Sequence, residues 1–314
     1  MRWADIPGSS LPVGRCLAVW QQYWQQRVPG FVRGKPLGAR AGQGRQWTVA
    51  WPDDLIRLAG GGRTAVHRRG SVVIRAAGPW TPAVHALLRH LQEKGFAAAP
   101  RLAGPGLDQD GREMLTFIDG EFTQPGPWSL AGAAALGALL RDLHQATRTF
   151  RPPAAAVWFP WHGRDLGGPH KIISHCDVAP WNIVARDGMP VALIDWETAG
   201  PVDPLVELAQ LCWLNAKLHD DTVAQREHLP PAAGRARQLA AIVNAYGLTA
   251  SQRRGFLDQI IQFAICDTAR EADDAAITPE TTAHPTALWA MAWRARSAAW
   301  MIRHRRILDT ALTR

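Results

Sequence analysis

A histidine, two acids and an asparagine in the middle of the chain have the types and spacing for phosphoryl transfer. His175, Asp177 and Asn182 form the pattern H-x-D-x-x-x-x-N, and Asp195 closes an apolar segment thirteen residues later. Phosphoryl transfer needs one carboxylate to take the acceptor's proton and oxygen ligands to hold magnesium on the nucleotide. We therefore predict Asp177 as the catalytic base, with His175 supporting its loop, and Asn182 and Asp195 as metal ligands.

The segment between Asn182 and Asp195 predicts a β-hairpin that carries both residues at its open end. Asp187-Gly188 stands between two apolar runs, which favours a two-residue turn. Counting back from that turn places Asn182 opposite Leu193. Opposed residues, and residues two apart on one strand, share a face of the sheet. Asn182 and Asp195 are therefore expected to point the same way, with Cβ atoms roughly 7–8 Å apart.

This stretch resembles the catalytic core of the aminoglycoside phosphotransferase-like family, which are small-molecule kinases of the protein-kinase-like fold. The resemblance covers about residues 54–310 and includes a glycine-rich hairpin, a third strand, a small-lobe helix, a hinge, the first large-lobe helix and the segment after the metal site. The matching stretches are residues 58–66, 71–75, 81–91, 114–120, 139–144 and 200–209.

The resemblance implies an α+β, bilobal fold, with a small antiparallel sheet and one helix in the N-lobe and a mainly helical C-lobe. Residues 53–120 would form the nucleotide-binding N-lobe and hinge, and residues 121–314 the C-lobe with the catalytic loop and acceptor site. Residues 1–52 read as an extension or linker, rich in Gly, Pro and Arg between Val28 and Arg45.

The resemblance also implies that ATP or GTP binds with Mg²⁺ between the lobes. Three successive glycines would let backbone amides approach phosphate oxygens closely. The expected nucleotide contacts come from this turn, the third strand and the hinge: Gly60, Gly61, Gly62, Arg63, Arg75, Thr116, Phe117 and Ile118.

One departure from the family pattern concerns the charge pair that grips the nucleotide phosphates. Kinase-like enzymes pair a strand Lys with an acid on the small-lobe helix. Arg75 stands at the Lys-like position, and no acid lies between Asp54 and Glu93, with His85 near the position of the expected acid. Arginine is always cationic and can bind phosphate bidentately. The departure favours, as an alternative to a kinase, a non-catalytic kinase-like protein that binds a nucleotide or another ligand.

The predicted reaction moves the γ-phosphate of a nucleotide to a hydroxyl of a small molecule, either aminoglycoside-like or another amino or sugar alcohol. Asp267, Glu271 and Asp274 recur at i, i+4 and i+7, one face of a helix. Such an acidic face suits a cationic acceptor. A solvated face balanced by Arg270 is the alternative interpretation.

Composition fits a cytoplasmic enzyme without nucleic-acid or membrane partners. The chain has 314 residues, a net charge of +8 and 47% apolar residues, without an apolar run long enough for a membrane span. The basic charge has no accompanying zinc-finger or RNA-recognition motif. The four cysteines are widely spaced, which argues against a zinc site or a disulfide framework. The oligomeric state stays open.

Overall fold

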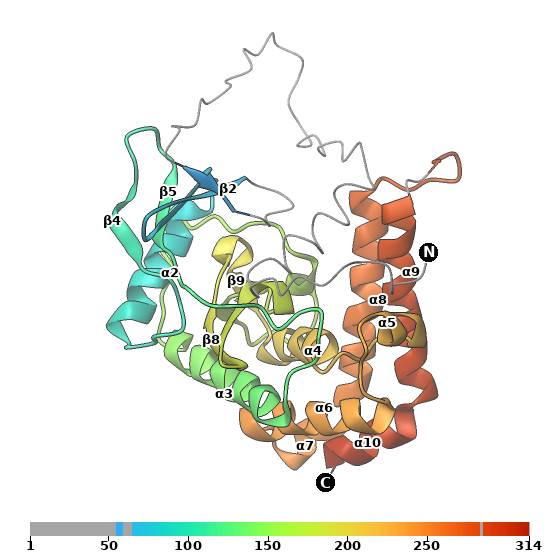
Figure 1. Cartoon of the computed structure of the whole chain (residues 1–314). Helices are drawn as coiled ribbons and strands as arrows, with labels where there is room; N and C mark the ends of the chain where they lie inside the picture. The colour runs from blue at the N-terminus through green and yellow to red at the C-terminus, as the bar shows by residue number, and fades with distance from the viewer. Residues whose placement is uncertain (1–54, 59–64, 283–284, 314) are drawn as a thin grey trace, which may run out of the picture.

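The computed structural model describes residues 55–58, 65–282 and 285–313 (Figure 1). The predicted extension, residues 1–52, and the predicted phosphate-binding residues Gly60, Gly61, Gly62 and Arg63 lie outside these ranges. No helix in the described ranges is both long and apolar enough to span a membrane.

The N-terminal part is an antiparallel five-stranded sheet in the order β1-β2-β3-β5-β4. Gly70, with a φ of +56°, makes the turn between β2 and β3. The β-branched run from Val72 to Ile74 favours the extended conformation of β3. The strands are β1 (Ile56–Arg57), β2 (Val66–Arg69), β3 (Val72–Arg75), β4 (Leu102–Leu107) and β5 (Glu113–Thr116).

Helix α2 (Thr81–Glu93) lies against this sheet and also reaches the helical part of the molecule. Its buried apolar residues recur at helical spacing and join one continuous core with the next helix, α3 (Leu130–Thr147). The buried residues are Val84, Leu87, Leu88 and Leu91 from α2, and Leu136, Leu140 and Leu143 from α3. The two lobes therefore share a core behind the site.

The C-terminal part is mainly helical, with two short two-stranded sheets near its junction with the N-lobe (Figure 1). The sheets pair β6 (Ile172–Ser174) with β9 (Gly200–Val202), and β7 (Ile183–Arg186) with β8 (Met189–Leu193). The helices are α4 (Pro204–Asn215), α5 (Asp221–Arg226), α6 (Ala232–Tyr246), α7 (Ala250–Arg253), α8 (Phe256–Asp274), α9 (Pro285–Arg303) and α10 (Arg305–Thr313).

Helices α3 and α6 pack so closely that one position on α3 admits no side chain. A Cβ atom on Gly137 would lie 2.1 Å from the carbonyl oxygen of Ile242 on α6. Helix α3 also contacts β6, which leads into the predicted catalytic loop, and β8, which pairs with the strand after that loop.

The β7–β8 hairpin forms at the predicted turn, but its predicted register is wrong by one residue. Ile183, and not Asn182, lies opposite Leu193. The register shifts between Val184 and Ala185, and Ala185 lies opposite Pro190. Proline has no backbone N–H to donate and is tolerated in a sheet at edges or bulges. The irregularity inserts one extra residue between these two pairs. Counting back from the turn therefore gives the wrong partner for Asn182 at the open end of the hairpin.

Candidate functional site

The loop from β6 to β7 holds the predicted base, and His175 ties that loop to the end of β8. The Nε2–H of His175 donates to the carbonyl of Ile194 over 2.8 Å, and the Asp177 backbone N–H donates to His175 Nδ1 over 3.2 Å. Both ring nitrogens are therefore used by a neutral imidazole. Complete burial lowers the pKa of His175, which keeps the ring neutral. His175 is built to orient the loop.

The structure brings Asp177 and Asn182 together. Asn182 ends a short 3-10 helix (Pro180–Asn182), and its Nδ2 donates to Asp177 Oδ2 over 2.9 Å and to the Asp177 carbonyl over 3.0 Å. Gln210 on α4 approaches Asp177 Oδ1 at 3.4 Å. The Asp177 carboxylate is thus positioned from both sides while its side chain stays partly accessible.

Asp195 lies beside Asn182 at the open end of the hairpin. The Ile194 N–H donates to the Asn182 carbonyl over 2.9 Å. This bond joins Asn182 to the residue that precedes Asp195. Asp195 has a φ of 62°, a left-handed conformation that few non-glycine residues adopt and that often marks a functional position. Its side chain is 45% exposed, in contrast to the buried residues around it.

These two residues fit a magnesium ion that is held mainly by nucleotide phosphates. The Asn182 nitrogen is used by Asp177, which leaves its Oδ1 as the metal donor. In residues 55–58, 65–282 and 285–313 there is no group of three or more His, Cys, Asp or Glu residues able to hold a metal. Magnesium usually binds through one or two carboxylates, waters and substrate phosphates, so a two-residue donor set suits it.

Arg75 pairs with an acid, but that acid comes from a strand instead of the helix. Arg75 Nε donates to the Glu113 carboxylate, directly opposite on β5, and Arg75 Nη1 donates to Asp195 Oδ1 over 2.6 Å. His85 on α2 contacts Glu113 Oε1 through Nε2 at 3.1 Å. His85 lies near the position of the missing helix acid, and Glu113 joins it to Arg75.

Charge explains why this buried group of side chains is stable. Arg75 is 7% and Glu113 2% exposed. Burial alone would raise the pKa of Glu113, but the hydrogen bond from His85 and the charge of Arg75 hold it below its ordinary value. Burial would lower the pKa of Arg75, and Glu113 and Asp195 raise it instead. Both groups therefore remain ionised.

A second buried acid, Glu207 on α4, supports the catalytic loop from below. Its Oε1 accepts from the Cys176 N–H over 2.5 Å, and its Oε2 lies 2.6 Å from His144 Nε2 on α3. Cys176 is fully buried in a left-handed conformation, with φ of 65°, and burial raises the pKa of its thiol well above the usual range. Cys176 is thus a packing residue, and its backbone N–H connects the loop to Glu207.

Of the predicted hinge residues, Thr116 ends β5, and Phe117 and Ile118 follow it. The Phe117 N–H donates to the Ser71 carbonyl over 2.7 Å. The Arg68 guanidinium lies 3.7 Å from the centre of the Phe117 ring, in a cation–π contact.

Arginines form ion pairs with the three acids of the predicted acidic face on α8. Arg294 on α9 contacts Asp267 at 2.6 Å and Glu271 at 3.1 Å, and Arg270 contacts Asp274 at 2.7 Å. These ion pairs offset the negative charge that was expected to attract a cationic acceptor. The acceptor role of the three acids stays a prediction.

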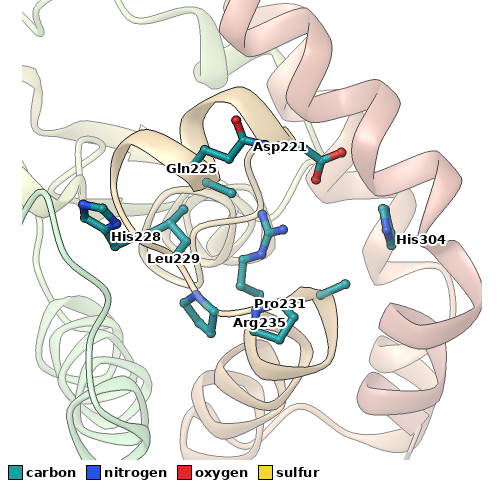
Figure 2. Close-up of a pocket in the computed structure, with 10 residues that line it drawn as sticks. Asp221, Gln225, His228, Leu229, Pro231, Arg235 and His304 are labelled. Atoms are coloured by element: carbon teal, nitrogen blue, oxygen red, sulfur yellow. The ribbon is translucent and has the colours of Figure 1, made fainter. Parts of the chain in front are cut away.

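A pocket of about 510 Å³ lies among α5, α6 and the C-terminal end of α9 (Figure 2). Arg235 rises into it from α6, and Asp221 and His304 face it from neighbouring elements. The Arg235 Nη1 donates to the carbonyls of Lys217 and His219. No predicted site residue lines this pocket, so it is separate from the catalytic loop.

Comparison with known proteins places this arrangement in a family. The phosphotransferase enzyme family matches residues 154–257, the stretch that contains the catalytic loop, the hairpin and α4. The chain is 53% identical over 261 residues to the trifolitoxin immunity protein of Rhizobium leguminosarum bv. trifolii, covering 83% of this chain and 99% of the relative. The chain belongs to the phosphotransferase enzyme family. The predicted family and enzyme class, a phosphotransferase, are thereby confirmed.

Solved structures confirm the protein-kinase-like fold predicted for this phosphotransferase. The microcompartment-associated aminopropanol kinase aligns with a TM-score of 0.55 at 13% identity, covering 83% of this chain and 94% of the other. The amicoumacin kinase hAmiN, in complex with AMP-PNP, Ca²⁺ and Ami, aligns with a TM-score of 0.54 at 14% identity, covering 83% and 89%.

Proposed function

We propose that this phosphotransferase uses ATP, or GTP, and Mg²⁺ to phosphorylate a hydroxyl group of a small molecule. The observation that carries the proposal is a pair of hydrogen bonds: Asn182 Nδ2 donates to Asp177 Oδ2, and the N–H of Ile194, the residue before Asp195, donates to the Asn182 carbonyl. Asp177, Asn182 and Asp195 would supply the three oxygen-bearing groups that the reaction requires.

Asp177 would accept a hydrogen bond from the acceptor hydroxyl and take its proton as the new bond to phosphorus forms. The bond between the γ-phosphorus and the bridging oxygen breaks, and the nucleoside diphosphate leaves with the electron pair. Asn182 and Asp195 would hold Mg²⁺, which neutralises charge on the phosphate oxygens. The hydrogen bonds from Asn182 and Gln210 would keep the Asp177 carboxylate in one orientation.

Arg75 would contact the nucleotide phosphates in place of the family's lysine. Its Nε is committed to Glu113, whereas its Nη1 contacts the exposed carboxylate of Asp195. A nucleotide with bound magnesium would compete for both Arg75 Nη1 and Asp195. Glu113 would thus anchor Arg75 through Nε, and the other guanidinium nitrogens of Arg75 would bind the phosphates.

The acceptor is proposed to carry both a hydroxyl and an amine, or to be a toxin. The aligned aminopropanol kinase is named for an amino alcohol. The 53%-identical relative is named for immunity to trifolitoxin, so phosphorylation of a toxin hydroxyl is one route by which this chain would confer immunity.

A second candidate is a non-catalytic member that confers immunity by binding its ligand. It is favoured by the replacement of the strand lysine with Arg75, whose Nη1 is occupied by Asp195. The two candidates differ in whether the ligand gains a phosphoryl group.

The deciding experiment incubates the full chain with ATP, Mg²⁺ and a panel of amino alcohols, aminoglycosides and trifolitoxin, and measures acceptor mass. A gain of one phosphoryl group is expected, and it should vanish in Asp177→Asn while nucleotide binding persists. Asp187→Asn, at the exposed hairpin turn, is the matched control and should retain activity. Turnover in Asp177→Asn would disprove the base assignment, and ligand binding without a mass change would favour the second candidate.

A further inference from the structure

A basic pocket of about 780 Å³ lies on the C-lobe, away from the predicted site residues. It is bounded by α3, the C-terminal end of α6, the start of α4 and the segment before β6. Three of its lining side chains are formally cationic: Arg141, Arg148 and Lys171. Arg141 is paired with Asp142, whereas the Lys171 ammonium donates to the uncharged backbone carbonyls of Arg164 and Leu166.

The one acid of the lining, Asp203, offsets one of these charges, although both of its oxygens accept backbone hydrogen bonds. Asp203 Oδ1 accepts from the Leu205 N–H over 2.8 Å, and Asp203 Oδ2 accepts from the Gly168 N–H over 2.6 Å. Asp203 caps α4, where a negative charge offsets the positive end of the helix dipole. Three cations against Asp142 and Asp203 leave one net positive charge at the pocket, which favours an anion.

A chain of buried hydrogen bonds leads from this pocket to the catalytic loop. Tyr246, which lines the pocket, places its hydroxyl 2.8 Å from His144 Nδ1. The Nε2 of His144 lies 2.6 Å from Glu207, and Glu207 accepts from the Cys176 N–H. Cys176 stands between His175 and Asp177. His144 is 6% and Glu207 0% exposed, so water does not compete for the bonds that Glu207 makes with His144 and Cys176.

The ionised Glu207 sets the direction of the hydrogen bond that it shares with His144. Burial would raise the pKa of Glu207, but hydrogen bonds from His144 and the Cys176 N–H hold it below its ordinary value. The carboxylate therefore accepts from His144 Nε2–H, and in the neutral tautomer that this implies, His144 Nδ1 accepts from the Tyr246 hydroxyl. An anion bound beside Tyr246 would compete for that hydroxyl and alter the support of the Cys176 N–H.

We propose that this pocket binds a small phosphate-bearing molecule, and that binding is transmitted through Tyr246, His144 and Glu207 to the catalytic loop. The pocket's charge selects an anion, and its volume accommodates more than a single phosphate group. Binding at the pocket is independent of the proposed reaction, whereas an effect on turnover rests on the proposed role of Asp177.

Calorimetric titration of the full chain with inorganic pyrophosphate tests the binding. A saturating non-hydrolysable nucleotide with Mg²⁺ is present to block the catalytic site. The double variant Arg148→Ala/Lys171→Ala is expected to bind at least tenfold more weakly, since it loses two of the three cations. Arg306→Ala, an exposed arginine of α10, is the matched control and should bind as the wild type does. Equal affinity in all three proteins would overturn the pocket assignment.

Hydrogen–deuterium exchange of the peptide spanning residues 172–182 tests the transmission without any need for catalysis. Pyrophosphate is expected to change exchange in this peptide at least twofold in the wild type. In Tyr246→Phe, which removes only the hydroxyl, binding should persist while the exchange change disappears. An unchanged peptide in the wild type, or the same change in Tyr246→Phe, would overturn the transmission.

Discussion

At the scale of single residues, the site depends on which acid compensates Arg75. In the family pattern this acid lies on the small-lobe helix. Here His85 stands near that position, and Glu113 on β5 supplies the carboxylate. Leaving one buried charge without its partner is costly, so an acid supplied from another element preserves the arginine. Glu113 joins Arg75, Asp195 and His85 as a fourth member of this group.

Replacing Glu113 with Gln is expected to lower the free energy of unfolding by about 1–3 kcal/mol, because it removes the charged acceptor of Arg75. Nucleotide affinity should fall roughly tenfold, since Arg75 is then drawn towards Asp195. Denaturant unfolding and nucleotide titration measure the two effects. Glu93→Gln, an exposed acid at the end of α2, is the control. Wild-type affinity in Glu113→Gln would show that Arg75 needs no such anchor.

At the scale of elements, the catalytic loop is positioned by the close packing of helices beneath it. Glu207 from α4 accepts from the Cys176 N–H and also contacts His144 from α3, and α3 is held against α6 at Gly137. Contacts between helices that are distant in sequence therefore determine the geometry of the loop.

Gly137→Ala should be destabilising, by about 1–3 kcal/mol, because the new Cβ would lie 2.1 Å from the Ile242 carbonyl and would force α3 and α6 apart. Helix propensity alone predicts the opposite sign, a gain of about 0.5–1 kcal/mol for Gly→Ala within a helix. Denaturant unfolding distinguishes the two, and a stabilised variant would contradict the packing described for these helices.

At the scale of the whole molecule, buried histidines link stability to pH. Burial lowers the pKa of His175 and, more strongly, that of His219. When a folded-state pKa lies below the unfolded value of about 6.5, the unfolded chain binds protons first as the pH falls. Stability is therefore complete above about pH 6.5 and declines as the pH drops towards the folded pKa values.

Thermal unfolding between pH 7.5 and 5 should accordingly show a falling midpoint, and His219→Gln should flatten the slope. His170→Gln, an exposed histidine, serves as the control and should leave the slope unchanged. The lowered pKa of Glu113 and Glu207 acts in a separate window, because their contribution is lost only below about pH 4.3. Identical slopes for His219→Gln and the wild type would contradict this account.

The sequence alone was enough to predict the family of the chain and most of the elements around the loop. The spacing of His175, Asp177 and Asn182 is local, as is the Asp187-Gly188 turn, so each can be recognised without knowledge of distant contacts. The family and the kinase-like fold followed from these motifs, and the comparisons confirmed them.

Only the tertiary structure decided which charges meet. Arg75 and Glu113 are partners because β3 and β5 are neighbours in the sheet, although α2 and β4 lie between them in the chain. Glu207 reaches the catalytic loop because α4 packs beneath it, and the irregularity in the β7–β8 hairpin shifts Asn182 by one place. Strand order, helix packing and register depend on burial over the whole molecule, which no local pattern records.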